Sequence, residues 1–295
     1  MELRQLVYTE AVERHRHFTR AADELHVAQS ALSQQIRKLE AELGTQLFER
    51  TSRRVIPTEA GEVVAARARR VLAEVDGVRS ELDELRGLVR GRLAIGALLP
   101  AGALDVTVLL ARFSRAFPGI EVGLREGTAA EMLALVEADA LDVTFCLLSG
   151  DPPASMEAMP LSEEEVVIAY PPGTAPAKRW ATVADLESVS LATPRSGSAI
   201  KLAVDERFTA AGASVRISLE SGDPYLIRCL VSDGFGPAVL PISITRRPGP
   251  EVETRPLRPA IRLPVCLIWR RGRHRSAAAS ALIDFVAEHA PGSPP

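Results

Sequence analysis

Five polar side chains around residue 30 have the chemistry needed to contact DNA base pairs. Glutamine and arginine make paired hydrogen bonds to adenine and guanine in the major groove, and serine hydroxyls bond to bases or phosphates. Leu32, Ile36 and Leu39 recur among them at helical spacing, so we expect a helix with its apolar side turned inward. A helix face exposed only to solvent has the same pattern, so the neighbouring segments are needed to distinguish a DNA-contacting face from a solvated one. The residues expected to point outward are Gln29, Ser30, Ser33, Gln34 and Arg37.

Two further short helices are expected before this one. Apolar residues recur at helical spacing over residues 3–11 and 18–25, and Thr19 is a candidate cap for the second helix. Only residues 26–28 separate the second helix from the third, which Gly44 ends. Two short helices joined by so tight a turn form a helix-turn-helix, which places its second helix in the DNA major groove.

A basic loop follows the third helix. Leu47 and Phe48 are apolar anchors, and Pro57 closes the loop beyond them. This pattern predicts a wing, a hairpin whose cations bind the phosphate backbone. The cations of the loop are Arg50, Arg53 and Arg54.

Residues 59–90 predict one long helix with an apolar seam. The seam residues alternate at steps of four and three, which is the heptad pattern of a helix that pairs with another helix. We therefore expect a dimerisation helix, and packing on the core of its own chain remains the alternative. The seam runs through Val64, Ala68, Val71, Val75, Val78, Leu82, Leu85 and Val89, and dimerisation is assigned to Val64, Val71, Val75, Val78, Leu82 and Leu85.

From Gly91 onward, predicted strands alternate with predicted helices. Such alternation indicates an α/β fold with mostly parallel sheets, in which ligands bind at the carboxyl ends of the strands, near helix N-termini. The expected strands are 92–98, 120–126, 141–148, 164–170, 189–193, 215–220, 237–240 and 265–269, and the expected helices are 105–117, 128–138, 198–211, 224–232 and 276–290.

Length and composition exclude several classes of protein. The 295 residues suffice for two or three domains, and the net charge of −3 excludes a polycation that coats nucleic acid by charge alone. With 4% aromatic residues, single-strand binding by base stacking is disfavoured. No apolar run reaches the roughly 18 residues of a membrane span, and the chain is charged from its second residue, so neither a membrane span nor a secretory signal is expected. Cys146, Cys229 and Cys266 have neither zinc nor disulfide spacing, so we expect buried thiols in a reducing cytosol.

Residues 18–40 resemble the signature of LysR-type transcriptional regulators. Gly44, residues 47–50 and residues 58–61 continue that signature in register. The match is specific over about the first 65 residues. Over the remainder it is looser but consistent, at residues 127–128, 141–143, 231–236 and Pro241.

The resemblance implies a multidomain chain with an all-α winged helix-turn-helix, a long linker helix and an α/β effector domain similar to periplasmic binding proteins. The implied boundaries are 1–58, 59–90 and 91–295, with one effector subdomain of 91–161 plus 267–295 and a second of 162–266. It also implies a bacterial, cytoplasmic regulator that binds double-stranded promoter DNA as a homotetramer, a dimer of dimers, and contacts RNA polymerase. A small-molecule co-inducer of unidentified nature would bind between the subdomains, with no cofactor, no metal and no membrane partner.

Carried onto this sequence, the family pattern assigns DNA contacts to the five residues named first and to Arg53 and Arg54 of the wing. Many members have serine or threonine where this chain has residues 98–101, and members that bind aromatic acids can carry arginine near Cys146. The ligand here is therefore expected to be less polar, or to rest its carboxylate on Thr128, Ser198 and backbone N–H groups. Residues 194–212 hold no cysteine, which disfavours thiol-based sensing. The effector positions implied are Leu99, Pro100, Ala101, Thr128, Cys146, Arg195, Ser196 and Ser198.

Two other classes of function have less support. An enzyme is disfavoured because no HExxH, GxSxG, phosphate-binding loop or dinucleotide-binding loop is present, and residues 163–165 are expected to form a solvated acidic turn. A ligand-binding module whose first helices serve only assembly would not need outward Gln, Ser and Arg beside the arginine-bearing loop of residues 29–54. The basic run 270–275 is expected to be a solvated loop, with DNA contact as the alternative.

Overall fold

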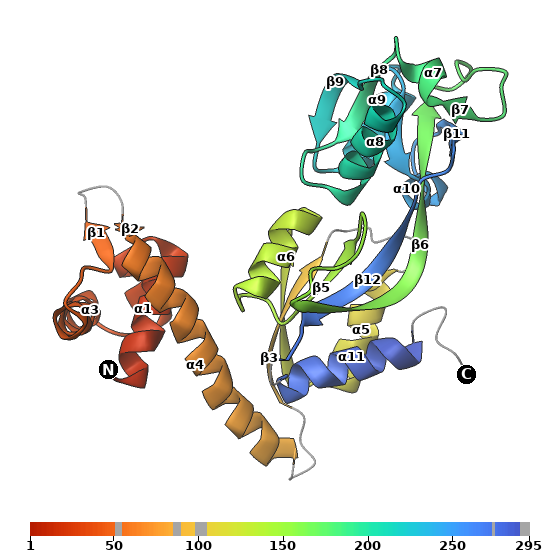
Figure 1. Cartoon of the computed structure of the whole chain (residues 1–295). Helices are drawn as coiled ribbons and strands as arrows, with labels where there is room; N and C mark the ends of the chain where they lie inside the picture. Colours follow the sequence, from red (N-terminus) through yellow and green to blue (C-terminus); the bar gives the residue numbers. More distant parts are fainter. Residues whose placement is uncertain (51–54, 85–89, 98–104, 273–274, 290–295) are drawn as a thin grey trace. The chain divides into compact units, whose positions relative to one another are not determined.

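The structure is a computed structural model, and it describes residues 1–50, 55–84, 90–97, 105–272 and 275–289 (Figure 1). The chain divides into two compact units, one built on residues 1–88 and the other on most of residues 89–295.

The first unit contains short helices, a two-stranded hairpin and one long helix. Its elements are α1 (Leu3–His15), α2 (Phe18–Glu24), α3 (Gln29–Leu43), β1 (Phe48–Arg50), β2 (Val55–Pro57) and α4 (Glu59–Glu84). The helices, the hairpin and the long helix expected from the sequence are thereby confirmed. A single apolar core joins them, formed mainly by Tyr8, Ala11, Val12, Phe18, Ala21, Ala22, Leu32, Ile36, Leu39, Leu47 and Phe48.

Two helix ends of this unit show how local chemistry sets element boundaries. As predicted, α3 ends at Gly44, whose φ of +69° is the left-handed conformation that glycine adopts without strain. The prediction that Thr19 caps α2 was wrong, because Thr19 is already inside the helix. The cap is His17, whose Nδ1 accepts the backbone N–H groups of Thr19 (3.1 Å) and Arg20 (3.4 Å).

The second unit is an α/β fold. Its strands are β3 (Gly91–Ala97), β4 (Ile120–Glu126), β5 (Val143–Leu147), β6 (Met156–Tyr170), β7 (Ala181–Thr182), β8 (Ser190–Pro194), β9 (Arg216–Ser221), β10 (Ala238–Pro241), β11 (Glu253–Arg258) and β12 (Arg262–Arg270). Its helices are α5 (Val106–Ala116), α6 (Ala129–Glu137), α7 (Val183–Leu186), α8 (Ala199–Ala210), α9 (Pro224–Ser232), α10 (Ile242–Arg246) and α11 (Ala277–His289). The expected elements are found, and β7, α7, α10 and β11 are additional to them.

The strands pair in the order β4-β3-β5-β12-β6-β10-β8-β9, and β11 joins β6. β3, β4 and β5 are mutually parallel, as are β8, β9 and β10. Between these two parallel groups lie β6 and β12, which run antiparallel to each other and to their other neighbours. We call β3–β5 with α5, α6 and α11 the first lobe, and β7–β11 with α7–α10 the second lobe (Figure 1).

The two lobes are joined by the long strands β6 and β12. Residues 156–165 of β6 pair with β12, whereas residues 166–170 pair with β10 and β11. The register of β12 against β6 shifts between Val265 and Cys266. The strands expected at 164–170 and 265–269 are therefore parts of longer strands, because each continues across both lobes.

The acidic run 163–165 is not a solvated turn, which corrects the expectation from the sequence. It lies inside β6, and the side chain of Glu164 is buried. Glu164 Oε1 accepts the backbone N–H of Ser243 (3.0 Å) in the first turn of α10, whose own cap position, Pro241, provides no side-chain hydrogen bond. Among the described residues, Glu164 Oε2 has no hydrogen-bond partner.

Replacing Glu164 with glutamine is expected to change how stability depends on pH. Burial raises the pKa of Glu164, although hydrogen bonds from Ser243 oppose that shift. A raised folded-state pKa makes the folded chain lose stability as the pH rises from the ordinary glutamate range through the folded pKa. Glu164→Gln removes this loss, so it should be the more stable protein at neutral pH, by about 1 kcal/mol. The two proteins should be equally stable near pH 4.

The measurement is urea unfolding of both proteins from pH 4 to pH 8. Trp180 and Trp269 are the two tryptophans of the chain, so tryptophan fluorescence reports on the second unit. Parallel pH curves for the two proteins would show that Glu164 does not titrate in this range.

Candidate nucleic-acid interface and effector cleft

α3 presents a polar face to solvent. Its fully buried apolar residues are Leu32, Ile36 and Leu39, and its exposed polar residues include Gln29, Ser30, Gln34 and Arg37. The exposed set combines neutral hydrogen-bonding groups with one cation, which matches base edges and phosphates rather than an apolar partner.

Ser33 does not belong to this face, and the prediction that it points outward was wrong. Its exposed fraction is 5%. Residues three apart are neighbours on one side of a helix, so Ser33 lies beside buried Ile36. The packing of α3 against α1 and α2 covers that side.

The predicted wing is a hairpin of β1 and β2. The strands are antiparallel, with Phe48 opposite Pro57 and Arg50 opposite Val55. Arg53 and Arg54, to which phosphate contacts were assigned, lie outside the described residues.

Glu40 of α3 ties the wing to the helix and was missed from the sequence. Its Oε1 accepts the backbone N–H groups of Leu47 (2.9 Å) and Phe48 (3.3 Å), at the start of the hairpin. The pattern gave no signal for this role, because a glutamate near the end of a helix is usually solvated. A hollow of about 490 Å³ lies beside this junction and is lined by Arg37, Glu40, Gln46, Phe48 and Glu49.

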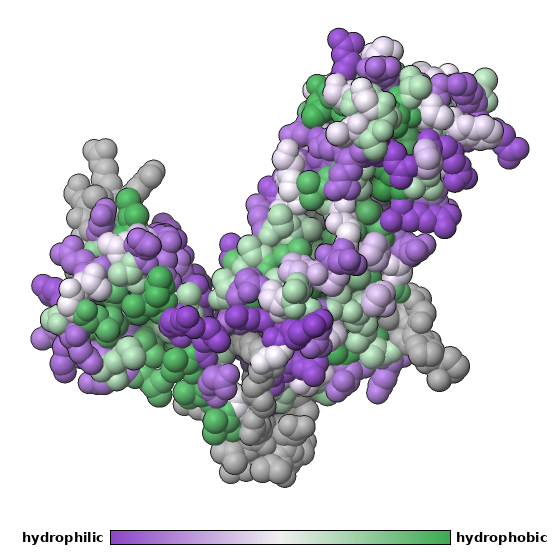
Figure 2. All heavy atoms as spheres, in the orientation of Figure 1, coloured by the Kyte–Doolittle hydropathy of each residue, from purple (hydrophilic) through white to green (hydrophobic). Residues whose placement is uncertain are grey.

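The apolar seam of α4 has two parts. Val64 is partly buried against the core of its own unit, and Ala68 is fully buried, so this part of the seam packs within the chain. Farther along, Val71 is 42% and Val78 59% exposed, and Figure 2 shows hydrophobic side chains on the visible face of α4. Val75 is half-buried, and the side chains of Leu82 and Leu85 lie outside the described residues.

In the second unit, the starts of α6 and α8 meet. The hydroxyls of Thr128 and Ser198 accept backbone N–H groups in the first turns of α6 and α8, and both residues are buried. The N–H of Ala130, in the first lobe, donates to the carbonyl of Gly197, in the second lobe (3.5 Å). The junction therefore brings together predicted effector-binding residues from both lobes, namely Thr128, Arg195, Ser196 and Ser198.

Cys146 does not face this junction. It lies inside β5 rather than after it, has no exposed surface and is paired in register with Cys266 of β12. Burial, with a smaller contribution from nearby Cys266, raises the pKa of the Cys146 thiol to about 12. A buried, protonated thiol offers no group to a ligand, so the assignment of Cys146 to the cleft was wrong. Leu99, Pro100 and Ala101 lie outside the described residues.

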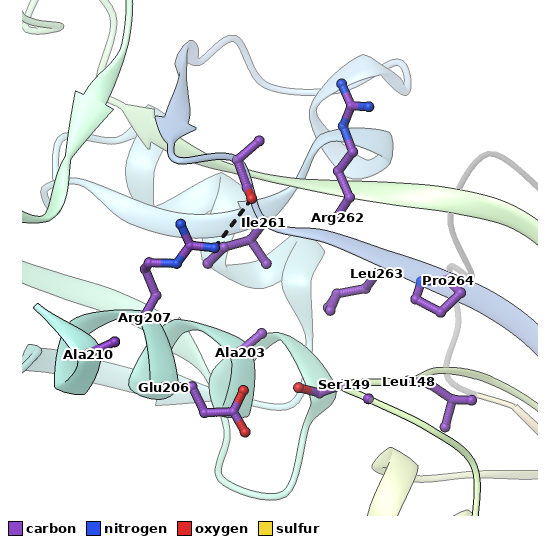
Figure 3. Close-up of a pocket in the computed structure, with 12 residues that line it drawn as sticks. Leu148, Ser149, Ala203, Glu206, Arg207, Ala210, Ile261, Arg262, Leu263 and Pro264 are labelled. Atoms are coloured by element: carbon purple, nitrogen blue, oxygen red, sulfur yellow. Dashed lines mark hydrogen bonds between the residues drawn. The ribbon is translucent and has the colours of Figure 1, made fainter.

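A pocket of about 330 Å³ lies along α8, between the lobes (Figure 3). It is formed by one face of α8, the loop after β5 and the start of β12. Glu206 and Ser149 point toward each other across the space, while Arg207 turns to the carbonyls of Pro259 (3.1 Å) and Ala260 (3.5 Å). The sequence did not predict this pocket. Four of its residues, Ala203, Glu206, Arg207 and Ala210, share one face of α8 at helical spacing, but the others come from distant segments of the chain.

Both units match family models of one kind. Residues 3–62 match the bacterial regulatory helix-turn-helix protein, lysR family, and residues 86–291 match the LysR substrate binding domain. The chain belongs to the LysR family of bacterial DNA-binding transcriptional regulators. Both the resemblance drawn from residues 18–40 and the predicted fold class are confirmed.

The chain is similar to LysR-type proteins over nearly its whole length. A RuBisCO operon transcriptional regulator of Allochromatium vinosum is 30% identical, over 98% of this chain and 97% of its own length. A hydrogen peroxide-inducible genes activator of Pectobacterium carotovorum subsp. carotovorum is 31% identical, over 99% and 98%. A full-length OxyR variant from Pseudomonas aeruginosa superposes with a TM-score of 0.74 and 26% identity, covering 100% of this chain and 99% of that one. CbnR in complex with its target DNA has a TM-score of 0.63 and 25% identity, covering 98% and 99%.

The relatives of this LysR-type regulator are transcriptional regulators rather than enzymes. In the part of the chain that the structure describes, His, Cys, Asp and Glu side chains form no cluster suited to a metal ion. Among the same residues, no helix is both long and apolar enough to cross a membrane.

Proposed function

We propose that this regulator binds double-stranded promoter DNA as a homo-oligomer and that a small-molecule co-inducer held between its lobes controls the binding. The observation that carries the proposal is the exposed polar face of α3, with Gln34 and Arg37, beside a wing that Glu40 fixes to the same helix. The relative CbnR, crystallised with its target DNA, supports this use of the first unit.

The proposed division of labour follows the elements. Residues 1–58 bind DNA, residues 59–90 link and dimerise, and residues 91–295 bind the effector. Within the effector domain, residues 91–161 and 267–295 form one subdomain and residues 162–266 the other. Exposed Val71 and Val78, seven residues apart on α4, support helix pairing in a dimer, and two dimers would form the tetramer.

The effector position is proposed at the junction of Thr128, Arg195, Ser196 and Ser198. The starts of two helices point partial positive charge at this place. The 330 Å³ pocket lies farther along α8 and is lined by none of these four residues. The buried Cys146 and the absence of cysteine from residues 194–212 favour a bound ligand over thiol oxidation. We also propose, from its membership of the family, that the regulator works in the cytoplasm and contacts RNA polymerase at the promoter.

A mobility-shift assay tests the proposal. Purified protein is mixed with the DNA immediately upstream of its own gene, against random competitor at several salt concentrations. A specific shift supports the proposal and provides an assay for screening effectors. No specific shift at any salt concentration, with or without a small-molecule library, would contradict it.

Replacing Gln34 with alanine should reduce discrimination between target and random DNA. Gln34 is exposed on α3 and uncharged, so its loss removes base contacts without changing phosphate attraction. A good bidentate contact contributes about 1–3 kcal/mol of discrimination, or roughly 5- to 150-fold in relative affinity. The salt dependence of binding should stay the same.

The matched control is Gln35→Ala. Gln35 is the next residue on α3, but it faces α1, where its Oε1 accepts from Gln5 Nε2 (3.5 Å). It should keep full discrimination. Equal discrimination by both variants would place the base contacts elsewhere.

A further inference from the structure

One carboxylate links the two lobes at the junction of α6 and α8. Glu131, in the first turn of α6, belongs to the first lobe, and Arg195, three residues before Ser198, belongs to the second. Glu131 Oε2 accepts both the backbone N–H of Thr128 (2.7 Å) and the Arg195 Nη2 (2.8 Å). The same oxygen therefore caps its own helix and pairs with a cation of the opposite lobe.

The neighbours of this pair hold it in place. Hydrogen bonds from Thr128, together with the charge of Arg195, lower the pKa of Glu131, so the carboxylate is ionised at neutral pH. The backbone N–H of Arg195 donates to the carbonyl of Ser221 (3.0 Å), and its side chain lies over Gly222. A β-carbon at Gly222 would come within 3.3 Å of Arg195 Cδ and Nε, so glycine leaves room for the arginine to lie there.

The backbone next to the pair reports on contact between the lobes. The first N–H groups of a helix have no acceptor inside the helix. That of Ala130, at the second position of α6, donates to the carbonyl of Gly197 in the other lobe. Gly197 has a φ of +84°, in the left-handed region that favours glycine. If the lobes separate at this point, the Ala130 N–H loses its acceptor and meets water.

We propose that Glu131 and Arg195 form a latch across the cleft and that an oxyanion effector opens it by displacing the Glu131 carboxylate. The inference rests on the proposed function of the cleft as the effector site. Two donors that would bind a carboxylate or similar oxyanion, the Thr128 N–H and the Arg195 guanidinium, already hold one that belongs to the chain. An effector with this chemistry takes over the guanidinium, and Glu131 then retains only its role as a helix cap.

The latch is weak enough to be regulated. The Arg195 and Glu131 side chains are 45% and 54% exposed, so water and salt screen their attraction. Exposed pairs of this kind change an equilibrium by about two- to fivefold. A contact of that size biases opening and closing without locking the lobes together.

Hydrogen exchange of the full-length protein, followed by mass spectrometry, tests the latch. Arg195→Gln should speed exchange in the peptide that covers residues 128–132 by about two- to fivefold, although the substitution lies in the other lobe. Glu131→Gln, which keeps the helix cap and loses the charge, should do the same for residues 195–198. Arg195→Lys keeps the charge and should stay closer to the natural protein. Lys178→Gln is the matched control, since it breaks the Lys178–Asp185 pair within the second lobe and should leave residues 128–132 unchanged.

Sodium sulfate is the oxyanion probe, compared with sodium chloride at equal ionic strength. Sulfate strengthens folded structure in general, so faster exchange confined to residues 128–132 and 195–198 would be specific to the latch. That result is expected in the natural protein and not in Arg195→Gln. If exchange changes only in the segment that carries each substitution, the latch is overturned. If sulfate acts no differently from chloride, displacement by oxyanions is rejected. Neither outcome involves DNA, so failure here is distinct from failure of the mobility-shift assay.

Discussion

Replacing Gly61 with alanine is expected to abolish specific DNA binding and to destabilise the first unit by about 3 kcal/mol. Gly61 lies in the first turn of α4. A β-carbon there would be 2.0 Å from the carbonyl oxygen of Leu47 and 2.9 Å from its carbonyl carbon. These are backbone atoms, so they cannot rotate away, and α4 must shift instead. The gain of about 1 kcal/mol from the better helix propensity of alanine does not offset this.

The shift would act directly on the wing. The carbonyl of Leu47 accepts the backbone N–H of Thr58 (3.0 Å), which closes the base of the β1–β2 hairpin. The Thr58 hydroxyl donates to the carbonyl of Gln46 (2.7 Å) and accepts the N–H of Gly61 (3.0 Å). Moving α4 away from Leu47 breaks this set of bonds. The wing would then lose its fixed position beside α3.

Differential scanning calorimetry and the mobility-shift assay check this prediction. A loss of about 3 kcal/mol should lower the melting temperature of a domain of this size by more than about 10 °C, while the transition of the second unit stays in place. Gly123→Ala is the control, because a β-carbon at Gly123 meets only the carbonyl oxygen of Leu93, at 3.9 Å. Normal DNA binding by Gly61→Ala, with an unshifted first transition, would show that α4 accommodates the methyl group.

Elements with local signals could be predicted from the sequence. The apolar spacing of residues 32–39 and the position of Gly44 predicted the third helix and its end, since helix period and left-handed glycine act within a few residues. The hairpin and the alternating strands and helices were predicted for the same reason. The family signature then added the domain plan, which composition and spacing alone do not contain.

Features that depend on pairing between distant residues could not be predicted. The full lengths of β6 and β12 come from their pairing with each other, residues 156–165 against 262–270, which local pattern does not reveal. Helical spacing placed Ser33 outward. Spacing identifies the core side of a single helix, but it does not show which of the adjoining sides neighbouring helices cover. Glu164 was expected in solvent because glutamate is rarely buried, and only tertiary packing puts it beneath α10.

Replacing Arg228 with alanine is expected to destabilise the second unit by about 3–5 kcal/mol, because three backbone carbonyls would lose the donor of a buried side chain and a cavity would remain. Arg228 of α9 is 4% exposed. Its Nε donates to the carbonyl of Pro250 (2.8 Å), and its Nη1 donates to those of Ile244 and Arg247 (both 2.7 Å). A lysine has one nitrogen and cannot replace this fork, so Arg228→Lys should recover only part of the loss.

Arg207→Ala separates the effect of burial from the effect of hydrogen bonding. Arg207 also donates to two backbone carbonyls, but it is partly exposed, so water can replace it and the loss should stay below about 1 kcal/mol. Urea unfolding followed by tryptophan fluorescence measures all three variants. Equal losses at Arg228 and Arg207 would contradict the argument. A large loss at Arg228 alone would show that the buried Arg228 guanidinium holds the carbonyls at the end of α10. A cation at this end of a helix is what the helix dipole favours, and it fixes α10 beside β6, one of the two long strands that join the lobes.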